Sequence, residues 1–472
     1  MKERFYLTTT LPYVNSDPHI GFALEIVHAD IIARYQRLLG KEVFFNTGTD
    51  EHGVKIYRKA LEVGKAPREY VDEYAEKFRS LLPKLGISKG VHFIRTTDEH
   101  HIIAAQEFWK RCDANGFIYK KNYSTKYCVG CELEKTDSEL VDGKCPIHPN
   151  LSIEVIEEEN YFFKFSQFQK KLQDLYADCP DFVVPPTRFN EIKAFIDRGL
   201  EDFSISRLKE KMPWGVSVPG DDSQVMYVWF DALVNYLSTI GWPNEEKFKE
   251  WWPVVQFAGK DNVRQQSAIW QAMLMAGGVE PSKQIVIHGF ITSGGVKMSK
   301  SLGNVIDPLQ IIEEFGTETL RFFLAKHVST FEDSDVTFER IKEAYNADLA
   351  NGLGNLVSRI MKMADQSGIK KQELGIKEEY EGNKELERYE IDKAIGKIWE
   401  KISTLDSFVQ TNEPYKTIKT DEEKAKKDIQ YLVDELFKIG LALIPFMPET
   451  AQKIQGLARE GKSPESPLFL RK

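Results

Sequence analysis

Short apolar segments that end in glycine and polar residues constrain the fold of this chain more than any other feature. The first, residues 5–9, is followed by a stretch from 19 to 39 whose apolar residues recur at the period of a helix. Three more apolar segments occupy residues 43–45, 254–258 and 285–287. Strands of a parallel sheet have this character, and ligands of such sheets bind beyond the carboxyl ends of the strands. The sequence therefore predicts an α/β protein built on a parallel sheet.

Two other regions break this pattern. Residues 116–225 carry aromatic-rich, charged strands around a cluster of cysteine and histidine. We interpret them as an insertion between two halves of the sheet, residues 1–115 and 226–290. After about residue 345, leucine and isoleucine recur at helical spacing, which predicts a helical bundle over 346–472. A chain of 472 residues has room for roughly three or four domains of this kind.

The composition excludes some classes of function. A formal net charge of −9 argues against a protein that coats nucleic acid through a uniform basic field, although an acidic chain can still read single-stranded RNA on a local surface. No segment approaches the about 18 apolar residues that a membrane-spanning helix needs, and the polar start lacks a signal-peptide core. We therefore expect a cytoplasmic protein that does not associate with membranes.

The spacing of the cysteines indicates a metal site rather than a disulfide framework. Three of the five cysteines and a histidine form two pairs, each separated by two residues: Cys128, Cys131, Cys145 and His148. Three thiolates and one imidazole complete a tetrahedral shell without water, which favours one structural Zn²⁺ per chain. The alternative is that these cysteines are reduced and only pack in a loop. The other two, Cys112 and Cys179, are expected to be small buried residues.

A turn and a loop that lie far apart in the sequence are both suited to a nucleotide. His19 and Gly21 follow the first predicted strand, where free N–H groups and the helix dipole favour a phosphate. Residues 297–301 read Lys-Met-Ser-Lys-Ser, and their two lysines can grip the pyrophosphate of ATP and neutralise its developing charge. The alternatives are a satisfied surface histidine and a solvated basic loop.

These two motifs together resemble the signatures of class I aminoacyl-tRNA synthetases. Residues 19–22, His-Ile-Gly-Phe, stand in place of His-Ile-Gly-His, and the Lys-Met-Ser-Lys-Ser motif is intact. The chain resembles methionyl-tRNA synthetases in particular through five further segments: residues 11–13, 47–53, 227–232, 288–290 and 346–351. The resemblance implies a Rossmann-type parallel sheet catalytic domain, a zinc-bearing connective insertion and a C-terminal α-helical bundle that binds the anticodon. It assigns residues 291–345 to the lysine loop and a segment that contacts the tRNA stem.

What the resemblance implies for function is an ATP-dependent ligase. Such an enzyme activates L-methionine with ATP and Mg²⁺ to methionyl-adenylate and transfers the methionyl group to the 3'-terminal adenosine of methionine tRNA. Two alternatives stay open: a class I synthetase for another apolar amino acid, and a catalytically weakened synthetase-like RNA-binding protein. The insertion is shorter than the editing insertions of the isoleucine, valine and leucine enzymes, which favours methionine. We expect a monomer.

The same resemblance implies roles for individual residues. The residues expected to bind ATP are His19, Gly21, Lys297, Ser299 and Lys300, and the histidine and both lysines are the expected catalytic groups. The residues expected to bind methionine are Leu11, Tyr13, Asp50 and Trp229. The carboxylate suits the α-ammonium and the two rings suit a thioether, although Trp229 alone is also typical of a core residue. Further residues expected near the active site are Arg207, Asp261 and Gln266, and those expected at the anticodon are Asn355, Arg359 and Tyr415.

Several of these positions depart from the family pattern. Phe22 replaces a histidine that would face ATP, and we expect it to pack against the nucleotide or a helix. Gln265 and Gln266 stand where the family often carries Phe-His, so selectivity against leucine or homocysteine, which rests on about 1–3 kcal/mol, could be affected. Tyr415 replaces a tryptophan and can still stack on a base. The alternative for the anticodon residues is a helix-capping, solvated Asn and Arg beside a surface tyrosine.

Overall fold

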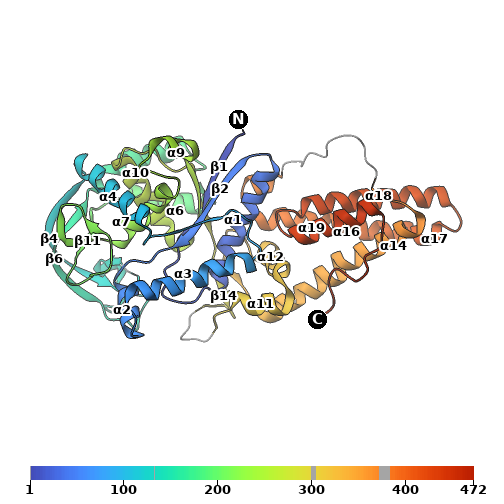
Figure 1. Ribbon diagram of the computed structural model, residues 1–472, viewed down its shortest axis with the longest axis horizontal. Helices are drawn as coiled ribbons and strands as arrows, with labels where there is room; N and C mark the ends of the chain where they lie inside the picture. Colours follow the sequence, from blue (N-terminus) through green and yellow to red (C-terminus); the bar gives the residue numbers. More distant parts are fainter. Residues whose placement is uncertain (1, 132, 299–303, 372–382) are drawn as a thin grey trace.

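The computed structural model describes residues 2–131, 133–298, 304–371 and 383–472. A sheet with its covering helices and the insertion form one end of an elongated molecule, and a helical bundle extends from the other (Figure 1). Helix α1 (Ile20–Leu38) lies between them. The predicted α/β class, with an inserted segment and a C-terminal helical bundle, is confirmed.

The central sheet has six parallel strands in the order β3-β2-β1-β12-β13-β7. Their bounds are β1 Arg4–Thr8, β2 Glu42–Thr49, β3 His92–Arg95, β7 Val183–Val184, β12 Val254–Gly259 and β13 Gln284–His288. All four apolar segments singled out in the sequence contribute strands. Strand β1 lies between β2 and β12. The strands that follow it directly in the sequence are added on one side, and β12 and β13 are added on the other. A crevice for ligands forms at the carboxyl ends of strands at such a switch point.

The insertion is mostly antiparallel. A four-stranded sheet runs in the order β5-β4-β6-β8, and a three-stranded sheet in the order β10-β11-β9. Their bounds are β4 Ile118–Cys128, β5 Leu133–Lys135, β6 Glu154–Phe163, β8 Phe203–Ser204, β9 Ser206–Leu208, β10 Ser217–Val218 and β11 Asp221–Met226. Two helices, α5 (Gln169–Asp178) and α6 (Pro186–Asp197), flank β7 in the sequence. Within the predicted insertion, β7 therefore returns to the central sheet, where Val183 and Val184 align with β13.

Helices cover the sheet and position its loops. The helix α1 is buried along most of its length, on faces that contact the sheet and α12 (Thr317–Lys326). An apolar stripe on only one side is therefore not seen, as expected for a helix between two layers. Other helices of this part are α2 Val54–Glu62, α3 Pro67–Lys84, α4 Glu99–Ala114, α7 Val228–Ala232, α8 Asn235–Ser238, α9 Glu245–Trp251 and α10 Trp270–Ala276.

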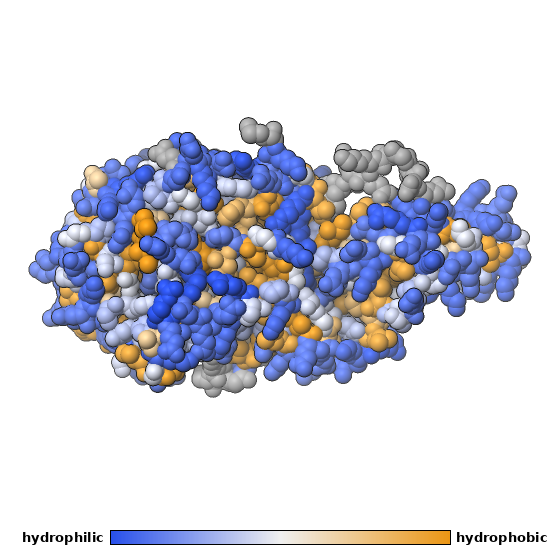
Figure 2. Space-filling view, viewed as in Figure 1, coloured by the Kyte–Doolittle hydropathy of each residue, from blue (hydrophilic) through white to orange (hydrophobic). Residues whose placement is uncertain are grey.

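After β13 the chain forms a small sheet and then the bundle. The small sheet contains β14 Ile291–Ser293, β15 Val296–Lys297 and β16 Ser334–Asp335, and helices α11 Pro308–Phe315 and α13 Phe338–Ala344 lie near it in the sequence. The long bundle helices are α14 Asn355–Ser367, α16 Ile391–Asn412, α18 Glu422–Ala442 and α19 Pro448–Glu460, with short α15 Lys384–Glu387 and α17 Pro414–Thr417. Hydrophilic residues line the outer edges of the bundle (Figure 2), while its isoleucines and leucines are buried.

Two sequence expectations have definite outcomes here. The fully buried thiol of Cys112 agrees with its predicted packing role, but Cys179 is exposed at the end of α5, so that prediction was wrong. Its sequence neighbours, Asp178 and Pro180, place it in a polar helix-ending segment, where nothing draws a side chain into the core. None of the described helices is long and apolar enough to cross a membrane.

Candidate active site

Two adjoining cavities open at the carboxyl ends of β1 and β12. The first, the turn cavity, has a volume of about 420 Å³. Residues that line this cavity but not the second include His19, Gly21, Phe22, Glu25, His288 and Phe290. The second, the central cavity, has a volume of about 370 Å³. Residues that line this cavity but not the first include Leu11, Asp50, Trp229, Leu233, Tyr236 and Gln266. Both are lined by Thr10, Pro12, Tyr13, Lys55, Asp261 and Asn262. A ligand in one cavity can therefore reach a ligand in the other.

The turn around His19 caps the first helix. The extended backbone of His19 places it at the N-cap of α1, and its Nδ1 accepts a hydrogen bond from the N–H of Gly21 at 3.0 Å. The imidazole proton is then on Nε2. A Cβ atom at position 21 would lie 2.8 Å from Cε1 of His19, so this capped turn requires glycine. The adjacent helix N-terminus favours an anion in the turn cavity.

The segments that flank the lysine loop lie near this turn. Lys297 pairs through its backbone with Thr292 in the β14–β15 hairpin, while Ser299 and Lys300 lie outside the described residues. Beyond the loop, the carbonyl oxygen of Ile306 accepts a hydrogen bond from the N–H of Ile20 at 3.1 Å. The start of the hairpin, Ile291, also lines the turn cavity. One flank of the loop thus contacts the first turn of α1, and the other lines the same cavity as that turn.

A buried ion pair forms one wall of the turn cavity. His288 Nε2 lies 2.8 Å from Glu25 Oε2, and its Nδ1 lies 2.8 Å from the carbonyl oxygen of Gly289. The other carboxylate oxygen accepts bonds from the N–H and hydroxyl of Thr10, at 2.6 and 2.7 Å. Burial disfavours a charged imidazole, but the bond to Glu25 outweighs it and raises the pKa of His288 above its ordinary value. Both ring nitrogens of His288 face acceptors, which favours the imidazolium form at the end of β13.

The central cavity is bounded by an acid and two aromatic rings. Tyr13 and Asp50 form an isolated parallel bridge, and the N–H of Asp50 donates to the carbonyl of Pro12 at 3.0 Å. Asp50 is 3% exposed as a residue, and a carboxylate shielded from water in this way is stabilised by a cationic partner. The ring of Trp229 meets the ring of Tyr13 edge to face, with centroids 6.1 Å apart. Leu11 adds an apolar edge to the same cavity.

Amide side chains close the back of the central cavity. Gln266 Oε1 accepts a hydrogen bond from Gln256 at 2.9 Å, and its Nε2 donates to the hydroxyl of Tyr236 at 2.9 Å. Gln256 in turn accepts from Ser282 at 2.6 Å. All four side chains are buried, so the orientation of the Gln266 amide is fixed at both ends. The oxygen and nitrogen of the Gln266 amide therefore cannot exchange places without breaking buried hydrogen bonds.

A second buried network lies beneath Trp229. Asp231, two residues further along α7, accepts hydrogen bonds from His52 Nδ1 at 2.6 Å and His101 Nε2 at 2.8 Å. Burial alone would raise the pKa of Asp231, but the two imidazoles lower it to about 2. The network joins α7 to the residues after β2 and to α4. It therefore fixes Trp229 relative to Asp50.

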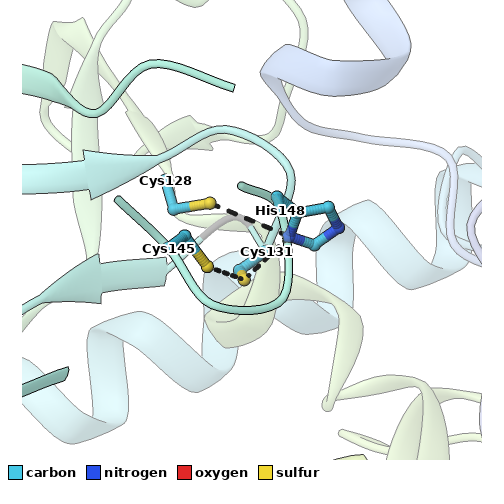
Figure 3. Close-up of side chains that lie close together, drawn as sticks. All are labelled: Cys128, Cys131, Cys145 and His148. Atoms are coloured by element: carbon cyan, nitrogen blue, oxygen red, sulfur yellow. Dashed lines mark hydrogen bonds between the residues drawn. The ribbon is translucent and has the colours of Figure 1, made fainter. Parts of the chain in front are cut away.

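The four predicted metal ligands lie together beside the central cavity. Cys128, Cys131, Cys145 and His148 point toward one another (Figure 3), with their donor atoms all within 4.8 Å. Cys131 Sγ is 3.4 Å from Cys145 Sγ and 3.2 Å from His148 Nδ1. Gly130 permits this approach, because a Cβ there would lie 2.5 Å from the His148 ring. This set of donors can hold one metal ion.

Comparison with known proteins decides the family. The family model described as tRNA synthetases class I (M) matches residues 5–153 and 148–361. The methionine–tRNA ligase of Thermotoga maritima is 39% identical over 473 residues, which cover 96% of this chain and 74% of that protein. The enzyme of Thermosynechococcus vestitus is 40% identical over 486 residues, covering 97% and 90%.

This chain belongs to the methionine–tRNA ligase family. The solved structures agree: the Mycobacterium tuberculosis methionyl-tRNA synthetase in complex with methionyl-adenylate superimposes with a TM-score of 0.90 at 33% identity. The superposition covers 99% of this chain and 100% of that one. The family resemblance inferred from the motifs is thereby confirmed.

Most residues that the family resemblance placed in the active site line the two cavities. Those with described side chains are Leu11, Tyr13, His19, Gly21, Asp50, Trp229, Asp261 and Gln266. Arg207 instead lines a separate cavity with Arg58 and Glu158. Its guanidinium lies 4.6 Å from the ring centroid of Tyr227 and donates to Ser204 at 2.7 Å. Within the described residues, Arg207 therefore lines neither the turn cavity nor the central cavity.

Sequence reasoning missed Lys55 and left Phe22 open. Lys55 lines both cavities, with Nζ 5.8 Å from the ring centroid of Tyr13 and 3.2 Å from the carbonyl oxygen of Gly130. Its position in the first turn of α2, directly after the Asp50 loop, was the available signal. Phe22 packs edge to face on Phe78 of α3, with ring centroids 5.0 Å apart, and also lines the turn cavity.

The three residues expected at the anticodon lie on the bundle. Asn355 begins α14 and is exposed, and Arg359, one turn later, pairs with Asp406 of α16 at 2.5 Å. Tyr415 of α17 is 47% exposed, and its hydroxyl donates to Glu413 at 3.1 Å. The tyrosine ring is thus available for stacking, while the arginine is held by a carboxylate.

Proposed function

We propose that this chain joins L-methionine to ATP across the central and turn cavities and then charges methionine tRNA. The observation that supports this most directly is the set of residues shared by the two cavities, above all Tyr13, Lys55 and Asp261. An amino-acid carboxylate in the central cavity and a triphosphate in the turn cavity would meet at these residues. Alignment of reactants and stabilisation of phosphate charge need no protein nucleophile.

Methionine fits the chemistry of the central cavity. Asp50 would pair with the α-ammonium group, since a nearly buried carboxylate gains from a cationic partner. Leu11, Tyr13 and Trp229 would surround the thioether, whose polarizable sulfur makes favourable contacts with aromatic rings. Gln266 would set the polarity at the far end through its fixed amide.

ATP with Mg²⁺ would occupy the turn cavity. The methionine carboxylate oxygen forms a bond to the α-phosphorus as the bond to the bridging oxygen breaks, and pyrophosphate leaves with the electron pair. His19, through Nε2–H, Gly21 and the α1 N-terminus would bind the phosphates. Lys297, Ser299 and Lys300 would approach from the loop whose flanking segments lie near the same turn, and they would stabilise the charge on pyrophosphate.

In the second step a hydroxyl of the 3'-terminal adenosine attacks the methionyl carbonyl carbon. The acyl–phosphate bond breaks, AMP leaves with the electron pair, and the hydroxyl proton passes to the leaving phosphate. Asn355, Arg359 and Tyr415 would read the anticodon at the bundle, where an exposed tyrosine ring can stack on a base. We propose that the enzyme works as a monomer in the cytoplasm.

Zn²⁺ is the metal that the cysteine and histidine set would hold. Three sulfurs and one imidazole nitrogen suit its tetrahedral preference and complete its shell, so the ion would stabilise the insertion without binding substrate. The cluster lies at the wall of the central cavity, which Cys131 and His148 also line. The metal would thus support the site indirectly.

ATP–pyrophosphate exchange, measured with each of the twenty amino acids, tests this function. We expect exchange that depends on methionine and falls at least about 100-fold in Lys300→Ala, the size of loss typical for one electrostatic stabiliser. Exchange with isoleucine, valine or leucine instead would indicate another specificity. A complete lack of exchange would support the RNA-binding alternative.

A further inference from the structure

Lys55 places a positive charge where the central and turn cavities adjoin. Within the described part of the chain, it is the single lysine or arginine that lines both cavities. It belongs to the first turn of α2, and the buried residues Ile56 and Ala60, one turn apart, hold this helix in place. Neither the contacts proposed for methionine nor those proposed for the phosphates use this side chain. Its role in the reaction is therefore open.

Two oxygen atoms fix the position of the Lys55 ammonium group. Nζ donates a hydrogen bond to the carbonyl oxygen of Gly130 at 3.2 Å. In the orientation that satisfies both ends of its amide, Asn15 accepts a bond from Nζ at 3.2 Å and donates one to the carbonyl oxygen of Tyr13 at 3.2 Å. Nζ also lies 5.8 Å from the ring centroid of Tyr13. The ammonium group is thus held between the metal cluster and the segment after β1.

The proposed reaction gathers negative charge at this place. The methionine carboxylate has to approach the α-phosphate of ATP, and like charges repel more strongly in a partly buried site than in water. The described walls of the two cavities add four carboxylates: Asp17, Asp50, Asp261 and Glu25. Lys77 pairs with Asp17 at 2.9 Å and His288 with Glu25 at 2.8 Å, so these two cations already balance wall charges. A further cation, fixed in place before the substrates bind, lowers the barrier to attack.

The other cations assigned to the reaction act at different atoms. His19 lines the turn cavity but not the central cavity. Lys297 and Lys300 have their proposed role at the pyrophosphate, which is the leaving group. Lys55 differs from them because it also faces the methionine side, from which the α-phosphorus is attacked.

We propose that Lys55 is a catalytic residue of methionine activation. Its ammonium group donates to a non-bridging oxygen of the α-phosphate and stabilises the charge that develops there as the methionine carboxylate attacks. Lys55 keeps its proton throughout, so the reaction gains no proton transfer. The carbonyl of Gly130 holds the ammonium group in place for this contact. The inference rests on the proposed function and adds a residue to its first step.

Ligand binding distinguishes contact with the α-phosphate from general support of the methionine site. Dissociation constants are measured by calorimetry for methioninol, which has no phosphate, and for methioninyl adenylate, the stable ester of methioninol with AMP. The variants are Lys55→Met, Lys55→Gln and Lys55→Arg, and two neutral replacements keep the test usable if one does not fold. Lys59→Met is the matched control, because Lys59 lies one turn along α2, pairs with Glu62 and lines neither cavity. Zinc analysis and thermal unfolding verify the metal cluster and the fold of each variant.

We expect both neutral variants to bind methioninyl adenylate at least about 10-fold more weakly and methioninol within about 2-fold of the unsubstituted enzyme, since only the first ligand carries a phosphate. Methionine-dependent exchange should fall roughly 100-fold, mainly in kcat, as for the loss of one electrostatic stabiliser. Lys55→Arg should keep part of the rate because it keeps the charge. Lys59→Met should behave like the unsubstituted enzyme in every assay.

Equal weakening of both ligands in the neutral variants would overturn the proposal, because it would show that Lys55 only supports the shape of the site. A loss of zinc in these variants would do the same, since Lys55 would then serve the metal cluster. Unchanged exchange would also contradict a catalytic role. If the unsubstituted chain gave no exchange, the proposed function would fail, while the binding of methioninyl adenylate would still decide whether Lys55 contacts the phosphate.

Discussion

Arg321 and Asp30 form a fully buried ion pair that joins the active-site half of the molecule to the bundle. Arg321 Nη2 of α12 lies 2.9 Å from Asp30 Oδ2 of α1, with both side chains at most 1% exposed. The same guanidinium donates to the carbonyl oxygens of Pro445 and Phe446, at 3.0 and 2.9 Å, between α18 and α19. Arg321 thus connects α1, the helix capped by His19, to the bundle.

Removal of that arginine should destabilise the whole chain. Arg321→Met removes one of the two arginines that pair with the buried Asp30 carboxylate, leaving Arg34, and it removes the donor to the carbonyls of Pro445 and Phe446. We expect unfolding to become easier by roughly 3 kcal/mol, because a buried ion pair and two buried hydrogen bonds are lost. Thermal unfolding measures the change, with the exposed Arg198→Met as control. An unchanged unfolding temperature in Arg321→Met would contradict a stabilising junction.

The His288–Glu25 pair predicts a loss of stability at high pH. The folded pKa of His288 is raised above the ordinary value of about 6.5, so its contribution is complete below that pH and is lost as pH rises through the folded value. Each unit of elevation corresponds to about 1.4 kcal/mol. We expect His288→Gln to lower the unfolding temperature strongly at pH 6 and less at pH 9. A difference that grew with pH would contradict a protonated imidazole.

The metal cluster predicts a specific effect of one cysteine. Cys128→Ser removes a sulfur ligand, so zinc measured by elemental analysis should fall below about half of one ion per chain, and the insertion should become sensitive to protease. Cys179→Ser, an exposed cysteine outside the cluster, should keep its full metal content. Full zinc in Cys128→Ser would show that this thiolate is not a ligand.

An anticodon role for the bundle predicts that a mutation there slows tRNA charging but not methionine activation. Arg359→Ala should slow tRNA charging by at least about 5-fold, as expected for a contact of about 1 kcal/mol or more, without changing methionine-dependent exchange. Its ion pair with Asp406 is one-third exposed, so its loss should change stability by at most about 1 kcal/mol. Lys362→Ala, exposed on the same helix, is the control. Equal losses in both assays would argue against an anticodon role.

The position of Gln266 at the back of the central cavity predicts that its replacement weakens the binding of methionine more than that of ATP. Gln266→Leu leaves the buried Gln256 amide and Tyr236 hydroxyl without this partner, a change of about 1–3 kcal/mol for each group. We expect the KM for methionine in the exchange assay to rise by roughly 10-fold, with little change in the KM for ATP. A larger change in the KM for ATP would place this residue in the other subsite.

Features carried by neighbouring residues were predictable from the sequence. The apolar segments before glycine marked strands β1, β2, β12 and β13, because parallel strands are buried on both faces. The two cysteine pairs marked the metal cluster, because ligand spacing within each pair already brings the donors together. The turn at His19 and Gly21 was recognisable because its cap is completed within three residues.

Only the tertiary structure decided which distant residues meet. Asp231 lies between His52 and His101, and Asp261 lines both the turn cavity and the central cavity, because the sheet order brings the ends of β1, β2 and β12 together. The sequence placed Lys55 only in the first turn after the Asp50 loop, and its position in both cavities became visible in the structure. The sequence by itself determined the local elements, the metal donors and the family. The strand order determined the cavities, since a contact between residues far apart depends on how the chain is threaded and not on its local pattern.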